Sequence, residues 1–347
     1  MKTKYRKVFI TNIPAFYKVN LFNEINDRVD IFVIFIAKKS RYRNEDFYGK
    51  NLRFDHVFLT NSFVEERSKS IILFKLINII TSLNFDEIVF SGWEIKESTV
   101  CSFLVAKNKN SIVIESSISE TKTTGFPWFF KKMMLSRMSK AYPSGELQRN
   151  ILNKANFKGE VRITHGVGIS NVSKLDKHKI DKKKNEPIKF LYVGRLSKEK
   201  NVLSLVNAFS TLENELFIVG EGDEKNILEK KSSKNIHFVG YVDNNLLKSY
   251  YEYCDCFILP SYSEPWGLVV EEALTMGMPV IVSNKVGCRE DLVTEQNGLI
   301  YDVDKLESLI AAIVSMSENY DHYRNGAMGF NVEDINNKQL NAYVSKC

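Results

Sequence analysis

The stretch "CDCFILPSYSEPWGLVVEEALTMGMPVIVS", residues 254–283, decides the fold. Its first part reads as a buried strand, "YSEPWG" as the loop that leaves it, and "LVVEEALTM" as an apolar helix that Gly277 ends before Pro279 opens the next strand. An apolar strand, a helix and a second apolar strand in this order are typical of a parallel sheet covered by helices. The segment therefore predicts one repeat of an α/β protein.

The same alternation runs along the whole chain and predicts two doubly wound parallel-sheet domains. The apolar runs that we interpret as strands lie at 7–10, 31–36, 87–90, 111–114, 188–194, 215–220, 235–240, 255–260 and 279–283. Between the halves, "SKLDKHKIDKKKNEP" has almost no apolar periodicity and ends in a proline, so it is interpreted as a linker. The predicted organisation is an N-terminal domain over 1–172, the linker over 173–187, a C-terminal domain over 188–325, and a helix over 326–347 that packs back on the N-terminal domain.

Composition describes an ordinary globular protein and excludes several classes. The chain has 347 residues, 44% of them hydrophobic, and a formal charge of +6, which allows an acidic partner without selecting one. The longest apolar run, 71–80, contains Lys75 and is shorter than the roughly 20 residues of a membrane helix, and the N-terminus lacks a signal-peptide core. A reducing cytoplasm is the expected location, since the cysteines suggest neither disulfides nor a zinc ribbon: Cys101, Cys254, Cys256, Cys288 and Cys347.

Cationic residues follow the strand that ends at Gly194. Arg195 and Lys200 stand between that strand and the apolar helix "NVLSLVNAF", where an arginine, a lysine and a helix N-terminus suit a diphosphate. Ordinary solvated cations on a surface turn explain these two residues equally well. In "LFIVGEGDEKNIL", Gly220 and Gly222 are interpreted as a tight strand-to-helix turn, because a dinucleotide motif needs a third glycine.

Two carboxylates, Glu264 and Glu272, flank the Trp-Gly turn of the opening stretch. One interpretation is helix capping and a favourable interaction with the helix dipole. The other is that both side chains reach a shared cleft at the helix N-terminus, where backbone N–H groups attract an anion. Their separation of about two turns places them toward different parts of one elongated ligand.

The motifs from residue 188 to residue 301 are similar to those of the group 1 glycosyltransferases, also called glycosyltransferase family 4. "GRLSKEKN", "IVGEGD", "FVGYV", "LPSYSEPWGLVVEEALTMGMPVIVS", "GCREDLV" and "NGLI" stand in the order and spacing of that family. The most specific element is the E-x7-E pattern of Glu264 and Glu272, together with Arg195 and Lys200 upstream. The resemblance is weak before residue 188.

This resemblance implies the GT-B fold, two Rossmann-like domains that face each other across a cleft, with the nucleotide-sugar held by the C-terminal one. It implies that Arg195 and Lys200 bind the donor diphosphate, that Glu264 contacts the transferred sugar and that Glu272 contacts the ribose. The remaining donor-site residues that it implies are Gly194, Gly220, Val242, Trp266, Gly267 and Leu268. The expected activity is retaining transfer from a UDP-sugar to a saccharide or lipid-linked saccharide of a bacterial surface polysaccharide, without cofactor or metal and with a peripheral contact at the inner membrane face.

The N-terminal half departs from the family pattern at three candidate acceptor-side positions. The glycine-rich loop of many members is replaced by "NIPAFYKVNLFNEIN", in which Lys18 is interpreted as a solvated helix residue and, alternatively, as an acceptor contact. At the strand end where members often carry a histidine, this chain has Glu115 and Ser116. His165 is interpreted first as a domain-junction residue and second as a ligand contact.

Several alternatives stay open beside this reading. Asp302 and Asp304 resemble a metal-binding D-x-D, but are interpreted as a turn residue and a helix N-cap. Cys254 and Cys256 are interpreted as buried thiols on one strand face. The segment 126–140 is interpreted as a partly buried helix at the cleft, with an acceptor or membrane contact as the alternative. A non-catalytic nucleotide-sugar sensor is the main rival; no nucleic acid partner is expected, because stacking motifs are missing.

Overall fold

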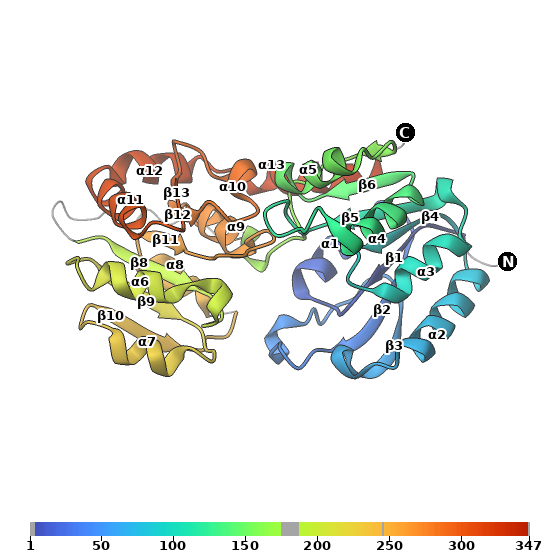
Figure 1. Ribbon diagram of the computed structural model, residues 1–347, viewed down its shortest axis with the longest axis horizontal. Helices are drawn as coiled ribbons and strands as arrows, with labels where there is room; N and C mark the ends of the chain where they lie inside the picture. The colour runs from blue at the N-terminus through green and yellow to red at the C-terminus, as the bar shows by residue number, and fades with distance from the viewer. Residues whose placement is uncertain (1–3, 175–186, 245, 346–347) are drawn as a thin grey trace. The chain divides into compact units, whose positions relative to one another are not determined.

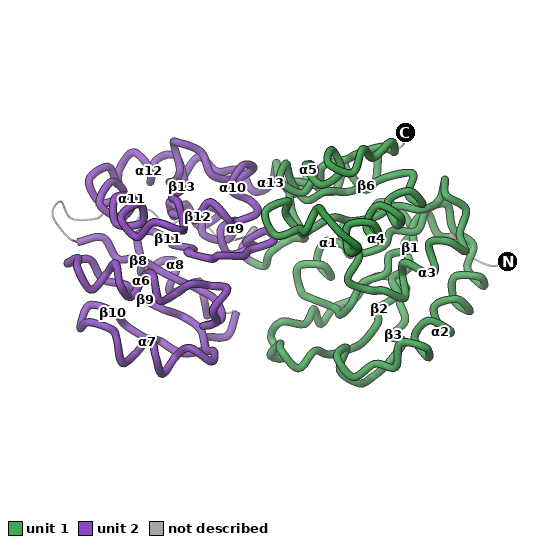
Figure 2. The backbone as a smooth tube through the Cα atoms, viewed as in Figure 1, with its two compact units in different colours: residues 1–171, 334–347 green, residues 172–333 purple. Residues whose placement is uncertain are grey.

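The computed structural model describes residues 4–174, 187–244 and 246–345. Within it the chain forms two compact units, which Figure 2 shows in green and purple. The first unit comprises Met1–Asn171 and Asp334–Cys347, and the second comprises Val172–Glu333. Most of the linker predicted over 173–187 lies outside the described residues.

The first unit is built on a seven-stranded sheet in the order β3-β2-β1-β4-β5-β6-β7, with every neighbouring pair parallel (Figure 1). Its strands are β1 (Lys4–Thr11), β2 (Ile31–Lys39), β3 (Asp55–Phe63), β4 (Asn84–Ser91), β5 (Asn110–Ile114), β6 (Lys140–Pro143) and β7 (Glu160–Val161). Its α-helices are α1 (Phe16–Asn26), α2 (Lys69–Ser82), α3 (Lys96–Leu104), α4 (Gly125–Ser136), α5 (Glu146–Ala155) and most of α13 (Val332–Val344). Its short 3-10 turns are η1 (Glu45–Phe47), η2 (Val64–Glu66) and η3 (Lys107–Lys109), and η4 (Asn171–Lys174) lies where the chain passes into the second unit.

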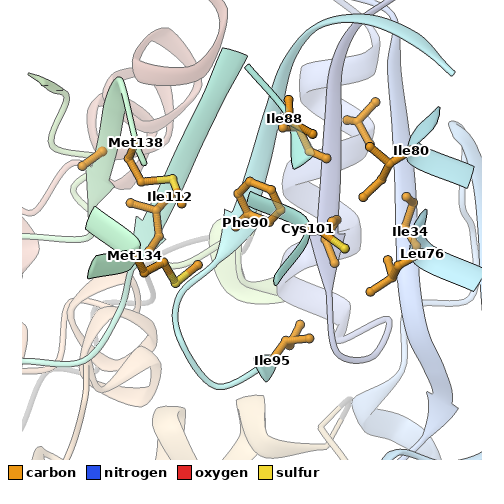
Figure 3. Close-up of a cluster of buried hydrophobic side chains, with 14 of the residues drawn as sticks. Ile34, Leu76, Ile80, Ile88, Phe90, Ile95, Cys101, Ile112, Met134 and Met138 are labelled. Carbon is orange, nitrogen blue, oxygen red and sulfur yellow. The ribbon is translucent and has the colours of Figure 1, made fainter. Parts of the chain in front are cut away.

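Helices cover both faces of this sheet, which is why its strands read as continuous apolar runs. Successive residues of β1 point to opposite faces. Val8 and Ile10 belong to the cluster of Figure 3, where Phe90 of β4 and Met134 of α4 also lie. Phe9 belongs to the opposite cluster, which contains residues of α1 together with Leu340 and Tyr343 of α13. The last helix of the chain therefore completes the core of the first unit.

The second unit repeats this architecture with a six-stranded parallel sheet in the order β10-β9-β8-β11-β12-β13. Its strands are β8 (Lys189–Val193), β9 (Glu215–Val219), β10 (Ile236–Gly240), β11 (Cys256–Leu259), β12 (Val280–Ser283) and β13 (Gly298–Tyr301). Its helices are η5 (Lys198–Lys200), α6 (Val202–Phe209), α7 (Lys225–Lys231), α8 (Leu247–Tyr253), α9 (Leu268–Thr275), α10 (Arg289–Leu292), α11 (Leu306–Glu318) and α12 (Tyr320–Met328).

Strand order places a topological switch point in each sheet. In the second unit the chain passes from β8 outward through β9 and β10, then returns to the other side of β8 as β11. Loops that leave β8 and β11 therefore diverge from one point at the carboxyl edge of the sheet, which is where open parallel sheets bind ligands. The corresponding switch in the first unit lies between β1 and β4.

The strand pattern missed β3, β6, β7 and β13. In β3, only Leu59 is buried, because the strand lies at the sheet edge and its sequence "DHVFLTNSF" mixes polar and apolar residues. β6 is only four residues long and ends at Pro143, which reads as a break. Strands that lie at a sheet edge or are very short therefore lack the apolar run on which the sequence interpretation depended.

Two local predictions were wrong. Asp304 is not an N-cap: α11 begins at Leu306 with Lys305 at the cap position, and no side chain caps it. Asp302 does hold the turn, because its carboxylate accepts from the Asp304 N–H (3.3 Å) and pairs with Lys305 (2.9 Å). Cys254 is the C-cap residue that follows α8, so only Cys256 lies in β11, although both thiols are buried.

Within the described residues, no helix is both long and apolar enough to cross a membrane.

Candidate functional site

A buried tyrosine of β8 holds the loop that follows this strand. Tyr192, in β8, donates its hydroxyl to the carbonyl oxygen of Arg195 at 2.9 Å. A Cβ at Gly194 would lie 2.7 Å from that hydroxyl oxygen, so the position accepts only glycine without rearrangement. The Gly194 N–H donates to Val219 O of β9 at 3.0 Å. These contacts fix the backbone of Arg195, whose side chain is exposed at the sheet edge.

Lys200 ends the short turn η5, and its ammonium forms an ion pair with the carboxylate of Glu264 in the loop after β11. Both side chains are largely buried, with 18% and 13% of their surface exposed. Asn201 follows in the left-handed region (φ 52°), and its side-chain amide donates to Pro260 O at 3.2 Å. The structure therefore brings together Lys200 and Glu264, two residues 64 positions apart, by tying the β8 loop to the β11 loop.

The backbone around Glu264 is fixed by the segment that follows β12. Glu264 forms an isolated parallel bridge with Val286, and its carbonyl accepts from the Gly287 N–H at 2.8 Å. The carbonyl of Trp266 accepts from the Cys288 N–H at 2.9 Å. This loop is therefore rigidly held at both ends, as a preorganised binding loop requires.

The helix α9 has no side-chain cap, so the capping interpretation of Glu264 is wrong. Gly267 occupies the N-cap position with φ +103°, a conformation that favours glycine, and Leu268 is the first helical residue. Trp266 is buried (2% exposed) just before this turn. The turn leaves the first backbone N–H groups of α9 uncapped by side chains, an arrangement that suits an anion.

Two adjacent glutamates of α9 are buried, and only Glu272 makes a well-formed side-chain hydrogen bond. Glu272 accepts a hydrogen bond from the hydroxyl of Tyr251 at 3.1 Å. Burial raises the pKa of Glu272 to about 7, against the opposing effect of Tyr251. Glu271 is 0% exposed, and burial raises its pKa to about 8, partly offset by the Trp266 indole. Carboxyl groups that titrate near neutrality are typical of functional sites.

Gly220 and Val242 follow β9 and β10 at the same sheet edge. A Cβ at Gly220 (φ +137°) would lie 1.9 Å from Gly194 O, so this glycine lets the loops after β8 and β9 approach. Its N–H donates to Gly240 O at 2.8 Å. Val242 is half-buried two residues after β10. The geometry supports the tight-turn interpretation of Gly220.

The candidate acceptor-side residues all lie in the first unit. Lys18, in α1, is buried and forms an ion pair with Glu115, directly after β5, so the interpretation of Lys18 as a solvated helix residue was wrong. The ammonium of Lys18 also lies 5.9 Å from the centre of the Tyr17 ring. Ser116 follows Glu115 and is half-buried. Lys18 and Glu115 therefore form a charged pair near the carboxyl ends of β1 and β5.

His165 adopts the left-handed conformation, with φ 55°, in the segment after β7. Burial, reinforced by Lys338 of α13, lowers the pKa of His165, so this imidazole is neutral over a wider pH range than an exposed one. The structure does not bring it into contact with Lys18 or Glu115 through any hydrogen bond among the described residues.

Three residues that hold the candidate site in place escaped the sequence interpretation: Tyr192, Asn201 and Tyr251. Each looks like an ordinary member of a strand or helix, and its role depends on a partner that only the fold brings near. The signal available in the sequence was the polar hydroxyl of Tyr192 inside an otherwise apolar buried strand.

No group of three side chains suited to a metal ion occurs among residues 4–174, 187–244 and 246–345.

Comparison with solved structures defines the class of fold. The chain is similar to sucrose-phosphate synthase from Thermosynechococcus elongatus, with a TM-score of 0.73, 18% identity and coverage of 97% of this chain and 98% of that one. It is also similar to HepE from Anabaena, solved in complex with UDP, with a TM-score of 0.68, 15% identity and coverage of 96% and 98%. The two parallel-sheet units thus form the GT-B fold of glycosyltransferases.

Sequence comparison finds relatives of the C-terminal half. Residues 173–327 match the family model described as "Glycosyl transferases group 1". Glycogen synthase of Mycobacterium tuberculosis is 33% identical over 143 residues, which is 38% of this chain and 34% of that protein. The O-antigen biosynthesis glycosyltransferase WbnH of Escherichia coli is 35% identical over 161 residues, 45% and 46% of the two chains. The matches therefore span about a third to a half of these relatives.

Proposed function

We propose that the protein is a retaining glycosyltransferase that moves a sugar from a nucleotide diphosphate sugar, with UDP as the nucleotide, to a hydroxyl of a saccharide. The observation that carries this proposal is the joining of Lys200, Glu264 and the α9 N-terminus at the switch point of the second sheet. A donor of this kind has three parts to be recognised at this place. Its diphosphate needs a cation, and the hydroxyls of its hexose and of its ribose each need a hydrogen-bond acceptor. The solved HepE complex with UDP supports the choice of nucleotide.

In the proposed reaction, the bond between the sugar C1 and the diphosphate oxygen breaks first, and the electron pair stays on the diphosphate. Arg195, Lys200 and the N–H groups at the start of α9 stabilise the charge that grows there. The acceptor oxygen then bonds to C1 on the face that the leaving group vacates, which retains the anomeric configuration. The acceptor proton passes to the leaving phosphate oxygen, so the reaction does not need a basic side chain to take up this proton.

We assign different ligand contacts to the two glutamates. Glu264 accepts from hydroxyls of the transferred sugar, and Glu272 accepts from the ribose hydroxyls. Because the ammonium of Lys200 pairs with Glu264, donor binding exchanges one charge-assisted contact for another. The ion pair also restricts both side chains, which reduces the entropy cost of binding.

We propose that the first unit supplies the acceptor site, with Lys18, Glu115, Ser116 and His165 as candidates. The O-antigen function in the name of the WbnH relative supports a saccharide or lipid-linked saccharide of a surface polysaccharide as the acceptor. Replacement of residues 1–165 by those of a relative should change the acceptor and leave the donor unchanged.

A peripheral contact with the inner face of the membrane is proposed for α4. Phe126, Phe129 and Phe130 expose 72%, 60% and 43% of their surface, while Met134 and Leu135 are buried, so the helix is partly buried as predicted. Exposed aromatic rings beside Lys131 and Lys132 suit an interface of acyl chains and anionic headgroups. Sedimentation with anionic vesicles tests this contact: replacement of the three phenylalanines by serine should abolish it.

The central test is a panel of UDP-, GDP- and ADP-sugars, measured for thermal stabilisation and for turnover. Stabilisation by a UDP-sugar together with sugar transfer or slow donor hydrolysis supports the proposal. Stabilisation without any turnover would instead favour the non-catalytic sensor. The same assay in EDTA tests metal independence, because side-chain cations and not a metal are assigned to the diphosphate. Loss of turnover that manganese or magnesium restores would contradict that assignment.

A further inference from the structure

Tyr251 is a buried residue of α8 that contacts the candidate ribose-binding glutamate. Only 3% of its surface is exposed, and its ring centre lies 6.4 Å from that of Phe257 in β11. Its hydroxyl donates to Oε2 of Glu272 at 3.1 Å. Since the ring is enclosed by the core of the unit, the hydroxyl is held at a fixed position.

The hydrogen bond divides the two oxygens of Glu272 between protein and ligand. Oε2 is engaged by Tyr251, whereas Oε1 has no hydrogen-bonding partner among the described residues. Glu271, one position earlier on α9, has two buried oxygens without a well-formed hydrogen bond. Burial on α9 therefore does not by itself supply a partner, and the Tyr251 contact is specific to the glutamate at the E-x7-E position.

We propose that Tyr251 is a positioning residue for nucleoside recognition: its hydroxyl fixes Oε2 of Glu272 so that Oε1 is presented to the ribose hydroxyls of the donor. This inference rests on the proposed function, because it assumes that Glu272 accepts from a ribose. The same hydrogen bond favours the ionised form of Glu272, which accepts more strongly than the neutral acid. Tyr251 therefore acts on both the orientation and the charge of the carboxylate.

The surroundings of Glu272 offer little else that would perform these tasks. On its own helix, the adjacent carboxyl is Glu271, and the two carboxyl groups repel each other when ionised. β12 carries no ionisable side chain, and β11 carries the buried thiol of Cys256. α12, which packs against α9, carries Tyr320, Asp321, His322, Tyr323 and Arg324. The guanidinium of Arg324 donates to Gly277 O at 2.7 Å, beyond the far end of α9.

The test compares Tyr251→Phe with Tyr253→Phe by titration calorimetry with UDP between pH 6 and pH 9. Tyr253 lies on the same helix but exposes 53% of its surface, and its ring contacts the Lys189 ammonium at 4.0 Å. Phenylalanine keeps the ring in both variants and removes only the hydroxyl. In Tyr251→Phe, affinity for UDP at pH 7 should fall by about threefold to tenfold, the scale of one lost hydrogen bond.

The pH profile and the Glu272→Gln background separate positioning from a structural role. The pH dependence of UDP binding should shift upward in Tyr251→Phe by about half a unit to one unit, and part of the loss of affinity should persist at pH 9, where the carboxylate is ionised but its orientation is no longer fixed. The Tyr253→Phe profile should superimpose on the original one, and Tyr251→Phe should add nothing in a Glu272→Gln background. A loss of affinity in Tyr251→Phe that persists in the Glu272→Gln background would overturn the inference, as would an unchanged affinity.

Failure of the proposed function is distinguishable, because the unchanged protein is titrated first. If it binds none of UDP, GDP and ADP at any pH, the nucleotide-sugar assignment itself is wrong. If it binds UDP and Tyr251→Phe binds UDP with the same affinity at every pH, only the role of Tyr251 is wrong.

Discussion

Each unit contains acidic side chains that are largely shielded from solvent, but the two units differ in the ion pairs and hydrogen bonds that they provide for these side chains. In the first unit, Glu87 of β4 is paired with Lys7 of β1, and it accepts from the Tyr142 hydroxyl (2.8 Å) and the Ser111 hydroxyl (2.5 Å). In the second unit, the side chains of Glu271 and Glu272 of α9 make one well-formed hydrogen bond in total, which Tyr251 donates to Glu272. A buried charge costs several kcal/mol unless it is paired, so ionisation of Glu271 or Glu272 destabilises the folded protein more than ionisation of Glu87 does.

The pKa values follow this difference. Burial on its own would raise the pKa of Glu87, but Lys7 together with Ser111 and Lys140 outweighs it and lowers the pKa. Burial dominates for the α9 pair and raises the pKa of Glu272 to about 7 and that of Glu271 to about 8. A compensated carboxylate supports the fold, whereas uncompensated carboxyl groups on the helix that follows β11 are typical of a functional site.

The largest expected effect comes from breaking the compensated cluster. Glu87→Ala leaves the Lys7 ammonium, 5% exposed, without its counter-charge, so the free energy of unfolding should fall by about 3–5 kcal/mol in urea denaturation. The double variant Lys7→Met/Glu87→Leu removes both charges and should recover most of that loss. The affinity of the folded variants for UDP should not change, and a large loss of affinity would contradict the purely structural role of Glu87.

The second expected effect concerns turnover. Arg195 is exposed, so Arg195→Ala should leave the melting temperature unchanged but lower kcat by about two orders of magnitude or more, the scale lost with one charge-stabilising donor. Lys198→Ala is the matched control, since Lys198 is an exposed cation three residues further along the same loop. Equal losses in the two variants would mean that general positive charge, and not the Arg195 guanidinium, stabilises the leaving group.

The third prediction separates the glutamates by ligand. Glu272→Gln should weaken binding of free UDP and of the intact donor alike, by about tenfold, because ribose contacts are equal in ground and transition states. Glu264→Gln should leave UDP affinity nearly unchanged while it lowers turnover or relaxes the choice of sugar. Calorimetric titration of both variants with both ligands measures this, and the opposite pattern would show that the ligand lies reversed along residues 264–272.

The main architecture and the loops that form the candidate site were predictable from the sequence, because both depend on local patterns. Buried parallel strands leave apolar runs, and the loops after β8 and β11 carry Arg195 and Glu264 directly behind such runs. Contacts between distant segments leave no such mark. Tyr251 lies 21 residues before Glu272 on a different helix, and Lys18 lies 97 residues before Glu115, so neither partnership was readable.

The smallest expected effect is on the pH dependence of stability, and here the two clusters act with opposite signs. For Glu271 and Glu272, the folded pKa lies above the unfolded value of 4.5, so the folded protein keeps protons that the unfolded chain releases. Their contribution to stability is complete below pH 4.5 and is lost as the pH rises through 7 and 8. For Glu87 the folded pKa is lowered, so its contribution is present above pH 4.5 and is lost as the pH falls further.

Glu271→Gln should therefore stabilise the protein only at alkaline pH. Removal of a buried ionisable group that makes no well-formed hydrogen bond should raise the melting temperature at pH 9 by about 2–6 °C, and should have little effect at pH 5, where the native carboxyl is already neutral. Glu290→Gln, on a side chain that exposes 44% of its surface, serves as the control and should change neither value. Differential scanning calorimetry at the two pH values gives the comparison directly. Equal shifts in melting temperature at pH 5 and pH 9 would mean that glutamine improves packing and that the carboxyl of Glu271 does not titrate in this range. The contrast between the buried carboxyl groups of α9 and the Glu87 cluster would then be wrong.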